Sequence, residues 1–273
     1  MKMKSFDAML IAALFSALAP CAAEETPPPV YGDIPDYGEK YLSPDFVKLG
    51  KSELAVTCRT GDELLLLDPQ SKGVKARVPL GGHPSGLAFS PDEKFAYVTI
   101  AAPAGELLKI SLADAKVTAR APAGHMPRAA VCSADGKTVY AANQFENLVR
   151  AFDAETLSEK ARGAAVRDPF SLALSKDGKK LYVANQLPES KGGLYEENIA
   201  AAVSVLDAKT LKTVAKIDLP NGSINAQEIK VSPDGRYAYL THVVARFNVP
   251  TTQVERGWIN TNAVSLVDTG SDK

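Results

Sequence analysis

The chain has few of the residues, and none of the motifs, that most often support metal, haem or nucleophilic chemistry. Its 273 residues include three histidines, three cysteines and one tryptophan. The sequence contains no Cys-x-x-Cys-His, no His-Glu-x-x-His, no Gly-x-Ser-x-Gly and no phosphate-binding glycine loop. We therefore expect no catalytic residues, no metal site and no cofactor within this chain, and we do not expect the chain alone to be an enzyme.

Neither sign of charge is in excess. Lysine and arginine number 31 against 32 aspartates and glutamates, which gives a formal net charge of −1 and a pI near 6.3. Such a chain has no strong field to attract nucleic acid or anionic lipid, so we expect no nucleic-acid partner. Hydrophobic residues make up 45% of the sequence, enough for a globular domain with its own core.

The longest apolar stretch lies near the N-terminus, at residues 8–19. It is shorter than the roughly 20 residues of a membrane-spanning helix, so we expect no transmembrane segment in the mature chain. Lys2 and Lys4 precede it and small residues follow, which predicts a cleaved signal peptide over 1–23 and a periplasmic or secreted protein. A lipoprotein anchored through Cys21 is the alternative, although Pro20 disfavours it. Residues 24–42 are proline-rich and indicate a linker.

Cys58 and Cys132 remain after cleavage, in a chain that we expect to enter an oxidising compartment. Cys132 aligns with Phe89, Leu174 and Val231 in the repeats described below, so a small apolar residue in a core strand explains it. The repeats that contain the two cysteines are not neighbours in sequence, which makes a close approach of their Cβ atoms less favourable. We therefore predict two thiols rather than a disulfide.

One phrase recurs four times along the chain. It reads "SPDEKFAYVTI" at 90–100, "SADGKTVYAAN" at 133–143, "SKDGKKLYVAN" at 175–185 and "SPDGRYAYLTH" at 232–242. The first three copies are about 42 residues apart, and each unit alternates short apolar strands with turns of the Asp-Gly kind. This pattern predicts an all-β propeller with four antiparallel strands in each blade.

The repeat divides the chain into blades and predicts a propeller domain over 43–273. Four complete blades are expected at 43–81, 85–124, 128–167 and 170–221, and a fifth begins at Ala226 and stops after its third strand, so about four and three-quarter blades are present. A propeller normally closes on itself and so protects its strand edges. Three explanations are open: a fragment of a longer protein, which we favour, a ring completed by another chain, or lost C-terminal blades.

The Ser-Pro-Asp-Gly turn, "YVAN" at 182–185 and "VSVLD" at 203–207 together resemble the YVTN-type β-propeller repeat over residues 43–268. The resemblance implies a seven-bladed ring, of which this chain would be an incomplete part. The segment 241–268 is similar to a stretch of secreted bacterial propellers that precede a c-type cytochrome domain of the di-haem peroxidase kind. That similarity implies a cytochrome c-type domain as partner, with haem only in a region beyond this chain.

In a propeller, the junctions between blades and the loops between second and third strands emerge on one face. We call it the loop-rich face, and it includes the long loops expected at 186–201 and 243–260. Its candidate residues for binding a ligand or partner are His83, His125, Arg128, Arg167, His242, Arg246, Gln253, Arg256, Trp258, Asn260 and Asn262. A purely structural interpretation also exists, since a Gly-x-x-Pro junction can simply position the next strand.

The main hypothesis is therefore a non-enzymatic, secreted propeller that binds a protein partner or a small ligand on the loop-rich face. One alternative is the N-terminal propeller of a periplasmic c-type haem redox enzyme that resembles cytochrome c peroxidase. Another is a metal-dependent hydrolase of the lactonase kind, which would need a metal near His83 and His125.

Overall fold

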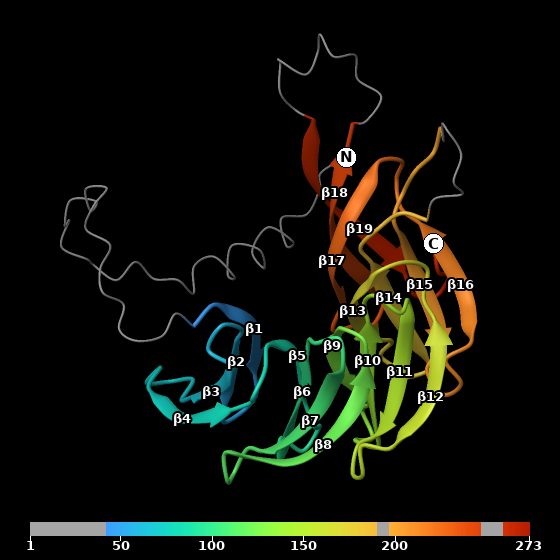
Figure 1. Ribbon diagram of the computed structural model, residues 1–273. Coiled ribbons are helices and arrows are strands. Elements are labelled where there is room, and N and C mark those ends of the chain that lie inside the picture. The colour runs from blue at the N-terminus through green and yellow to red at the C-terminus, as the bar shows by residue number, and fades with distance from the viewer. Residues whose placement is uncertain (1–41, 190–196, 247–258) are drawn as a thin grey trace, which may run out of the picture. The chain divides into compact units, whose positions relative to one another are not determined.

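The computed structural model describes residues 42–189, 197–246 and 259–273, and its strands form five antiparallel sheets, here called blades one to five (Figure 1). All five belong to one compact unit that extends from Lys40 to Lys273. The predicted signal peptide lies outside the described residues, and so does the predicted linker apart from Leu42. Among the residues described, none forms a helix long and apolar enough to span a membrane.

Blades one to three each contain four strands that pair in chain order. Blade one consists of β1 (Pro44–Leu49), β2 (Leu54–Cys58), β3 (Glu63–Leu67) and β4 (Val74–Pro79). Blade two consists of β5 (Pro84–Phe89), β6 (Phe95–Ile100), β7 (Gly105–Ser111) and β8 (Lys116–Gly124). Blade three consists of β9 (Pro127–Cys132), β10 (Thr138–Asn143), β11 (Leu148–Asp153) and β12 (Glu159–Ala164).

Blade four has the same order, and three strands of blade five lie in the described part of the chain. Blade four consists of β13 (Pro169–Leu174), β14 (Lys180–Asn185), β15 (Ala202–Asp207) and β16 (Thr213–Asp218). Blade five contains β17 (Ser223–Val231), β18 (Tyr237–Ala245) and β19 (Asn260–Asp268). The all-β class and the antiparallel blade predicted from the repeat are confirmed.

The loop expected at 243–260 was placed wrongly at both ends. Strand pairing between β18 and β19 continues outwards through Val243, Val244 and Ala245, which face Asn262, Thr261 and Asn260. The backbone hydrogen bonds of this ladder extend the strands beyond the apolar core, so Asn260 and Asn262 are strand residues.

The recurring phrase forms the turn between the first and second strands of a blade. In blade four the Ser175 hydroxyl donates to Asp177 Oδ1 at 2.6 Å, and the Lys179 amide donates to the same oxygen at 3.1 Å. The Lys180 amide closes the turn on Ser175 Oγ at 2.9 Å. Gly178 has a φ of 69°, which a residue without Cβ adopts at little cost. Blades two, three and five repeat these bonds with Ser90 and Asp92, Ser133 and Asp135, and Ser232 and Asp234.

The hydrophobic core lies between successive blades. The first strands contact one another in the order β1, β5, β9, β13 and β17. Each pair of neighbouring blades shares an apolar cluster. The cluster of blades two and three, for example, includes Tyr97, Leu107, Val139 and Phe152. A blade therefore needs a neighbour on each face to bury its apolar side chains.

Cys58 and Cys132 are free, which confirms the prediction of two thiols. Cys58 ends β2 and is buried, whereas Cys132 ends β9 and is partly exposed. Burial raises the pKa of the Cys132 thiol to about 11. The thiolate is the reactive form, so this environment makes Cys132 a poor nucleophile near neutral pH.

Candidate functional site

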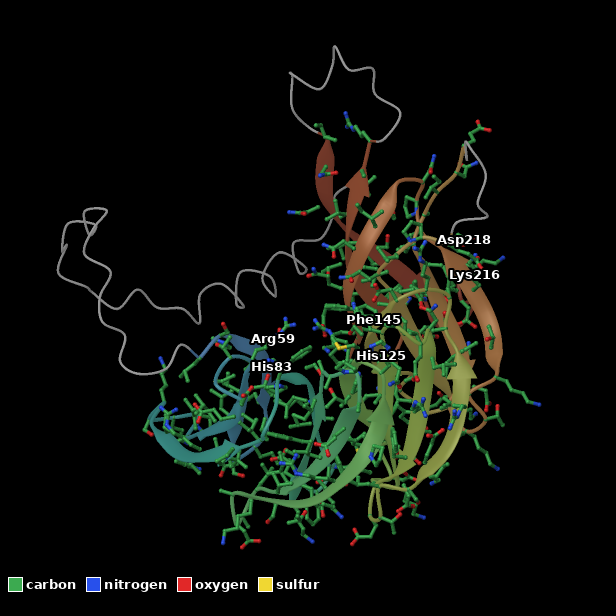
Figure 2. All side chains as sticks on the ribbon, viewed as in Figure 1. Arg59, His83, His125, Phe145, Lys216 and Asp218 are labelled. Atoms are coloured by element: carbon green, nitrogen blue, oxygen red, sulfur yellow. The ribbon has the colours of Figure 1, made fainter. Side chains whose placement is uncertain are left out.

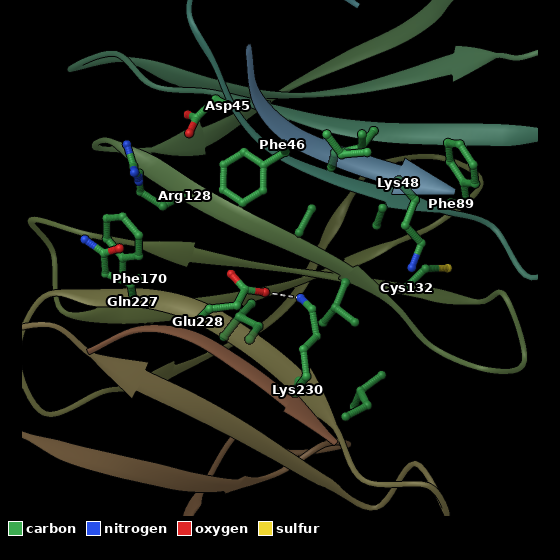
Figure 3. Close-up of a pocket in the computed structure, with 18 of the residues that line it drawn as sticks. Asp45, Phe46, Lys48, Phe89, Arg128, Cys132, Phe170, Gln227, Glu228 and Lys230 are labelled. Carbon is green, nitrogen blue, oxygen red and sulfur yellow. Dashed lines mark ion pairs between the residues drawn. The ribbon is translucent and has the colours of Figure 1, made fainter. Parts of the chain in front are cut away.

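The first strands of the five blades line a cavity of about 740 Å³ (Figure 3). Four of these strands begin with a proline, and the pairing of each of the five is irregular near its start. Such β-bulges turn side chains out of the normal alternation and are common next to binding sites. The residues that follow the four prolines differ: Asp45, Ser85, Arg128 and Phe170.

Ser85 has a structural role at this position. Its hydroxyl donates to the carbonyl oxygen of Pro127 at 2.6 Å and lies 3.1 Å from Thr99 Oγ1. The backbones of the two inner strands are close here, because a Cβ on Gly86 would come within 2.6 Å of the Ala129 backbone. Ser85 thus joins blades two and three and has no free hydroxyl to offer a ligand.

Arg128 is the most unusual residue in the cavity wall. It is only 8% exposed, and its guanidinium carbon lies 4.2 Å from the centre of the Phe170 ring. Its Nε atom is buried and has no hydrogen-bond partner. Figure 3 shows the guanidinium between Phe170 and Asp45, with Phe46 beside it. A buried cation held by an aromatic ring, with a donor unused, is an arrangement suited to an anionic ligand.

Burial lowers the pKa of Arg128, and Asp45 and Asp168 act in the opposite direction. Asp168 ends the junction before β13 and is itself buried, with a φ of 56° and an unpartnered Oδ1 atom. Burial raises the pKa of Asp168, while a hydrogen bond with the Gln144 side chain and, to a smaller extent, the charges of Arg128 and Arg167 lower it in part. The two carboxylates therefore support the charge of Arg128 electrostatically.

The opposite end of the cavity has a different chemistry. Lys48, Phe89 and Cys132 lie there, and Glu228 and Lys230 on β17 form an ion pair along the wall between the two ends (Figure 3). Lys230 and Glu228 are both exposed and satisfy each other. Among the described residues that line the cavity, the buried side-chain polar atom without a hydrogen-bond partner is Arg128 Nε.

The two histidines of the blade junctions have separate environments (Figure 2). His83 Nδ1 lies 2.9 Å from the Arg59 carbonyl oxygen and 3.0 Å from Asp62 Oδ1. The ring of His125 packs edge-on against Phe145, with 5.4 Å between the ring centres. Across the described residues, no group of three histidine, cysteine or acidic side chains could hold a metal ion. The histidines are thus fixed by local contacts of the rim.

The remaining predicted residues are dispersed. Arg167 donates to the Pro188 carbonyl at 3.0 Å, and Arg246 bonds Ile259 through its backbone. His242 is buried, its Nε2 atom lies 2.9 Å from Ser265 Oγ, and burial lowers its pKa. It therefore bonds a neighbouring strand rather than a loop. Asn262 lines a smaller cavity with His242, and Asn260 is exposed at the start of β19. Gln253, Arg256 and Trp258 lie outside the described residues.

Sequence reasoning selected Arg128 but missed the residues around it. Asp45, Phe46, Phe170 and Gln227 are not exceptional in their own repeats, and only the fold brings them into one cavity. One sequence signal was present, since the residue after the strand-initiating proline differs in each of the four blades. A position whose residue varies from blade to blade is not required for the blade to fold.

Antiparallel blades that pack in sequence around a cavity lined by their first strands define the chain as a β-propeller. No protein-family model matches the chain, and no curated protein sequence is significantly similar to it. Among solved structures, it is similar to the hydrazine synthase of Kuenenia stuttgartiensis, with a TM-score of 0.75 and 22% identity. The match covers 85% of this chain, which spans 65% of the hydrazine synthase chain. At this identity, the similarity supports the fold.

Proposed function

We propose that the chain is a binding propeller and that it holds an anionic group of its ligand at the Arg128 end of the central cavity. The observation that carries this proposal is the buried Arg128 guanidinium with its unpartnered Nε atom, stacked on Phe170. Burial of a charged group without full compensation costs free energy, so a ligand that completes its hydrogen bonds recovers that cost.

The shape of the site favours a planar acid such as a carboxylate. A guanidinium can donate two parallel hydrogen bonds to a carboxylate, which a lysine cannot do. Phe46 and Phe170 flank Arg128 in the cavity wall and offer an apolar surface for the rest of the ligand (Figure 3). Asp45 lies on the opposite side and would disfavour a second negative charge. A singly charged aromatic acid therefore matches the wall best.

The proposal is tested by titrating the protein with benzoate in a calorimeter. Benzyl alcohol, which has the same ring without the charge, serves as the ligand control. Arg128→Gln should weaken benzoate binding by about 10-fold to 100-fold, the range expected for hydrogen bonds to a charged group. Arg128→Lys should recover only part of the affinity, because it restores the charge without the two-pronged geometry.

Arg162 provides a matched protein control. It lies on the outer strand β12, is exposed, and pairs with Glu159 at 2.7 Å. Arg162→Gln removes one positive charge from the protein while leaving the cavity intact, so benzoate affinity should stay the same. Equal weakening in the Arg128 and Arg162 variants, or equal affinity for benzoate and benzyl alcohol, would contradict the proposal. Thermal unfolding of each variant shows whether it is folded.

The finer features inferred from the sequence also stand as proposals. We infer a YVTN-type repeat and a ring of seven blades from the recurring phrase, and secretion or a periplasmic location from residues 1–23. A protein partner on the loop-rich face, including a cytochrome c-type domain, remains compatible with the Arg128 site, which an acidic side chain of that partner could fill. A lactonase-like activity has less support, because His83 and His125 are bound in separate contacts.

A further inference from the structure

Successive blades are joined by a repeated tyrosine hydrogen bond. Three tyrosines occupy the third position of the second strand in blades two, three and four. Each donates its hydroxyl to the turn between the third and fourth strands of the next blade. Tyr97 and Tyr140 bond the backbone carbonyl of the residue that follows the first aspartate of that turn. The bonds are Tyr97 to Ala154 at 2.9 Å and Tyr140 to Ala208 at 2.8 Å. The Tyr182 hydroxyl reaches the same turn of blade five, where it lies 3.4 Å from the Thr269 carbonyl oxygen and donates to Asp272 Oδ1 at 2.9 Å.

Tyr239 has the same position in blade five. It is the third residue of β18 and pairs with Leu266 on β19, as Tyr140 pairs with Ala151 and Tyr182 with Val205. Tyr97, Tyr140 and Tyr182 are at most 5% exposed, whereas Tyr239 is 41% exposed. No hydrogen bond of its hydroxyl to another described residue is present. Blade five thus carries the donor of an interblade bond without the acceptor.

The side chains around Tyr239 show the same difference. In blade four, Val203 and Val205 lie on the face that meets blade five, and both are fully buried. Their counterparts in blade five, Val264 and Leu266, are 58% and 55% exposed. Tyr239, Val264 and Leu266 form what we call the outward face of blade five. Its composition is that of an interior blade interface.

We propose that this outward face is a docking surface for a further blade of the same repeat, carried on the same polypeptide. In the docked state, Tyr239 donates its hydroxyl to the turn between the third and fourth strands of that blade. The acceptor is the backbone carbonyl of the residue that follows the first aspartate of the turn. Val264 and Leu266 become buried against its second strand. The inference rests on the proposed larger ring but is independent of the Arg128 site.

A second copy of this chain does not fit the surface in the same way. Propellers typically contain between four and eight blades, and five are present here. If the five blades of a second copy continued the ring, it would contain ten blades, which is more than the usual maximum of eight. One to three further blades remain within the usual range. The repeated tyrosine bond also specifies a blade of this repeat, rather than an arbitrary apolar partner.

The first test is to read the coding sequence that follows Lys273. We expect a strand to pair with β19 and then a blade whose turn contains Asp-x-x-Ser or Asp-x-x-Thr. In the longer polypeptide that includes the further blade, Tyr239→Phe should lower the melting temperature by about 2–4 °C. This is the effect of losing one buried hydrogen bond in a domain of this size. In the chain that ends at Lys273, the same substitution should change it little.

Tyr140→Phe is the matched control, because its bond to Ala208 is present in both chains. It should lower the melting temperature of both by a similar amount. A stop codon directly after Lys273 would overturn the proposal, and so would a Tyr239→Phe variant of the longer polypeptide that is as stable as the parent. Tetranitromethane should nitrate Tyr239 more slowly in the longer polypeptide, because the further blade covers the ring. Equal rates of nitration in the two chains would also overturn the proposal. Benzoate binding at Arg128 is measured separately and depends on neither result.

Discussion

The two ends of the blades differ in how strictly they repeat. At the end that carries the Ser-x-Asp turns, four blades repeat the same three hydrogen bonds. At the loop-rich end, each blade has different side chains and different partners. Ser175 and Asp177 are typical of the first end, and their counterparts in three other blades bond identically. At the second end, Asp45, Ser85, Arg128 and Phe170 occupy one repeat position. The repeated end is explained by folding alone, and the variable end contains the features that folding alone does not explain.

Substitution of one glycine at each end should give the largest difference in stability between the two ends. A Cβ on Gly86 would lie 2.6 Å from backbone atoms of Ala129 on the next inner strand. We expect Gly86→Ala to lower the free energy of unfolding by about 3 kcal/mol, because two backbones must separate. Gly178 has open space around its Cβ position, so Gly178→Ala costs only its positive φ, about 1 kcal/mol. Urea denaturation of both variants measures the contrast, and equal losses would contradict it.

Serines at the two ends give a smaller contrast. Ser85 is fully buried, and Ser85→Ala leaves the Pro127 carbonyl without its donor. We expect a loss of about 2 kcal/mol in unfolding free energy, since an unsatisfied buried group adds to the lost bond. Ser175 lies at the surface, where water can replace it, and Ser175→Ala should cost less than about 1 kcal/mol. If Ser175→Ala is the more damaging, the inner strands are not the rigid part of the fold.

The turn aspartates predict a modest dependence of stability on pH. Hydrogen bonds from serine lower the pKa of Asp92, Asp135, Asp177 and Asp234. A folded pKa below the unfolded value of about 3.9 stabilises the protein above that pH, and the contribution is lost as the pH falls through the folded pKa. Asp177→Asn should therefore lose less stability than the parent between pH 5 and pH 2. Parallel curves for the two proteins in chemical denaturation would exclude this contribution.

Much of the fold follows from the sequence because local and global signals agree. The Ser-x-Asp turn, the apolar strands on both sides and the repeat length all indicate the same four-stranded blade. The limits of the long loop were less predictable, since β18 and β19 continue as a ladder beyond the apolar residues. That extension depends on backbone hydrogen bonds, which the side-chain pattern does not encode.

The site was less predictable than the fold. Arg128 could be selected because it lies in a blade junction on the loop-rich face, but its stacking on Phe170 depends on the approach of two blades. His83 and His125 occupy similar repeat positions, yet the neighbouring loops give one a backbone carbonyl and the other an aromatic ring. Equivalent positions in a repeat predict equivalent backbone placement, and the contacts of each side chain depend on the loops around it.

The most direct test of the central claim is a crystal structure of the protein grown with para-bromobenzoate, in which anomalous scattering locates the bromine. We predict that the carboxylate contacts the Arg128 guanidinium and that the ring lies against Phe46 and Phe170, which places the bromine inside the central cavity. Bromine ordered only at other sites, with an unoccupied Arg128, would contradict the assignment of this end of the cavity as the binding site.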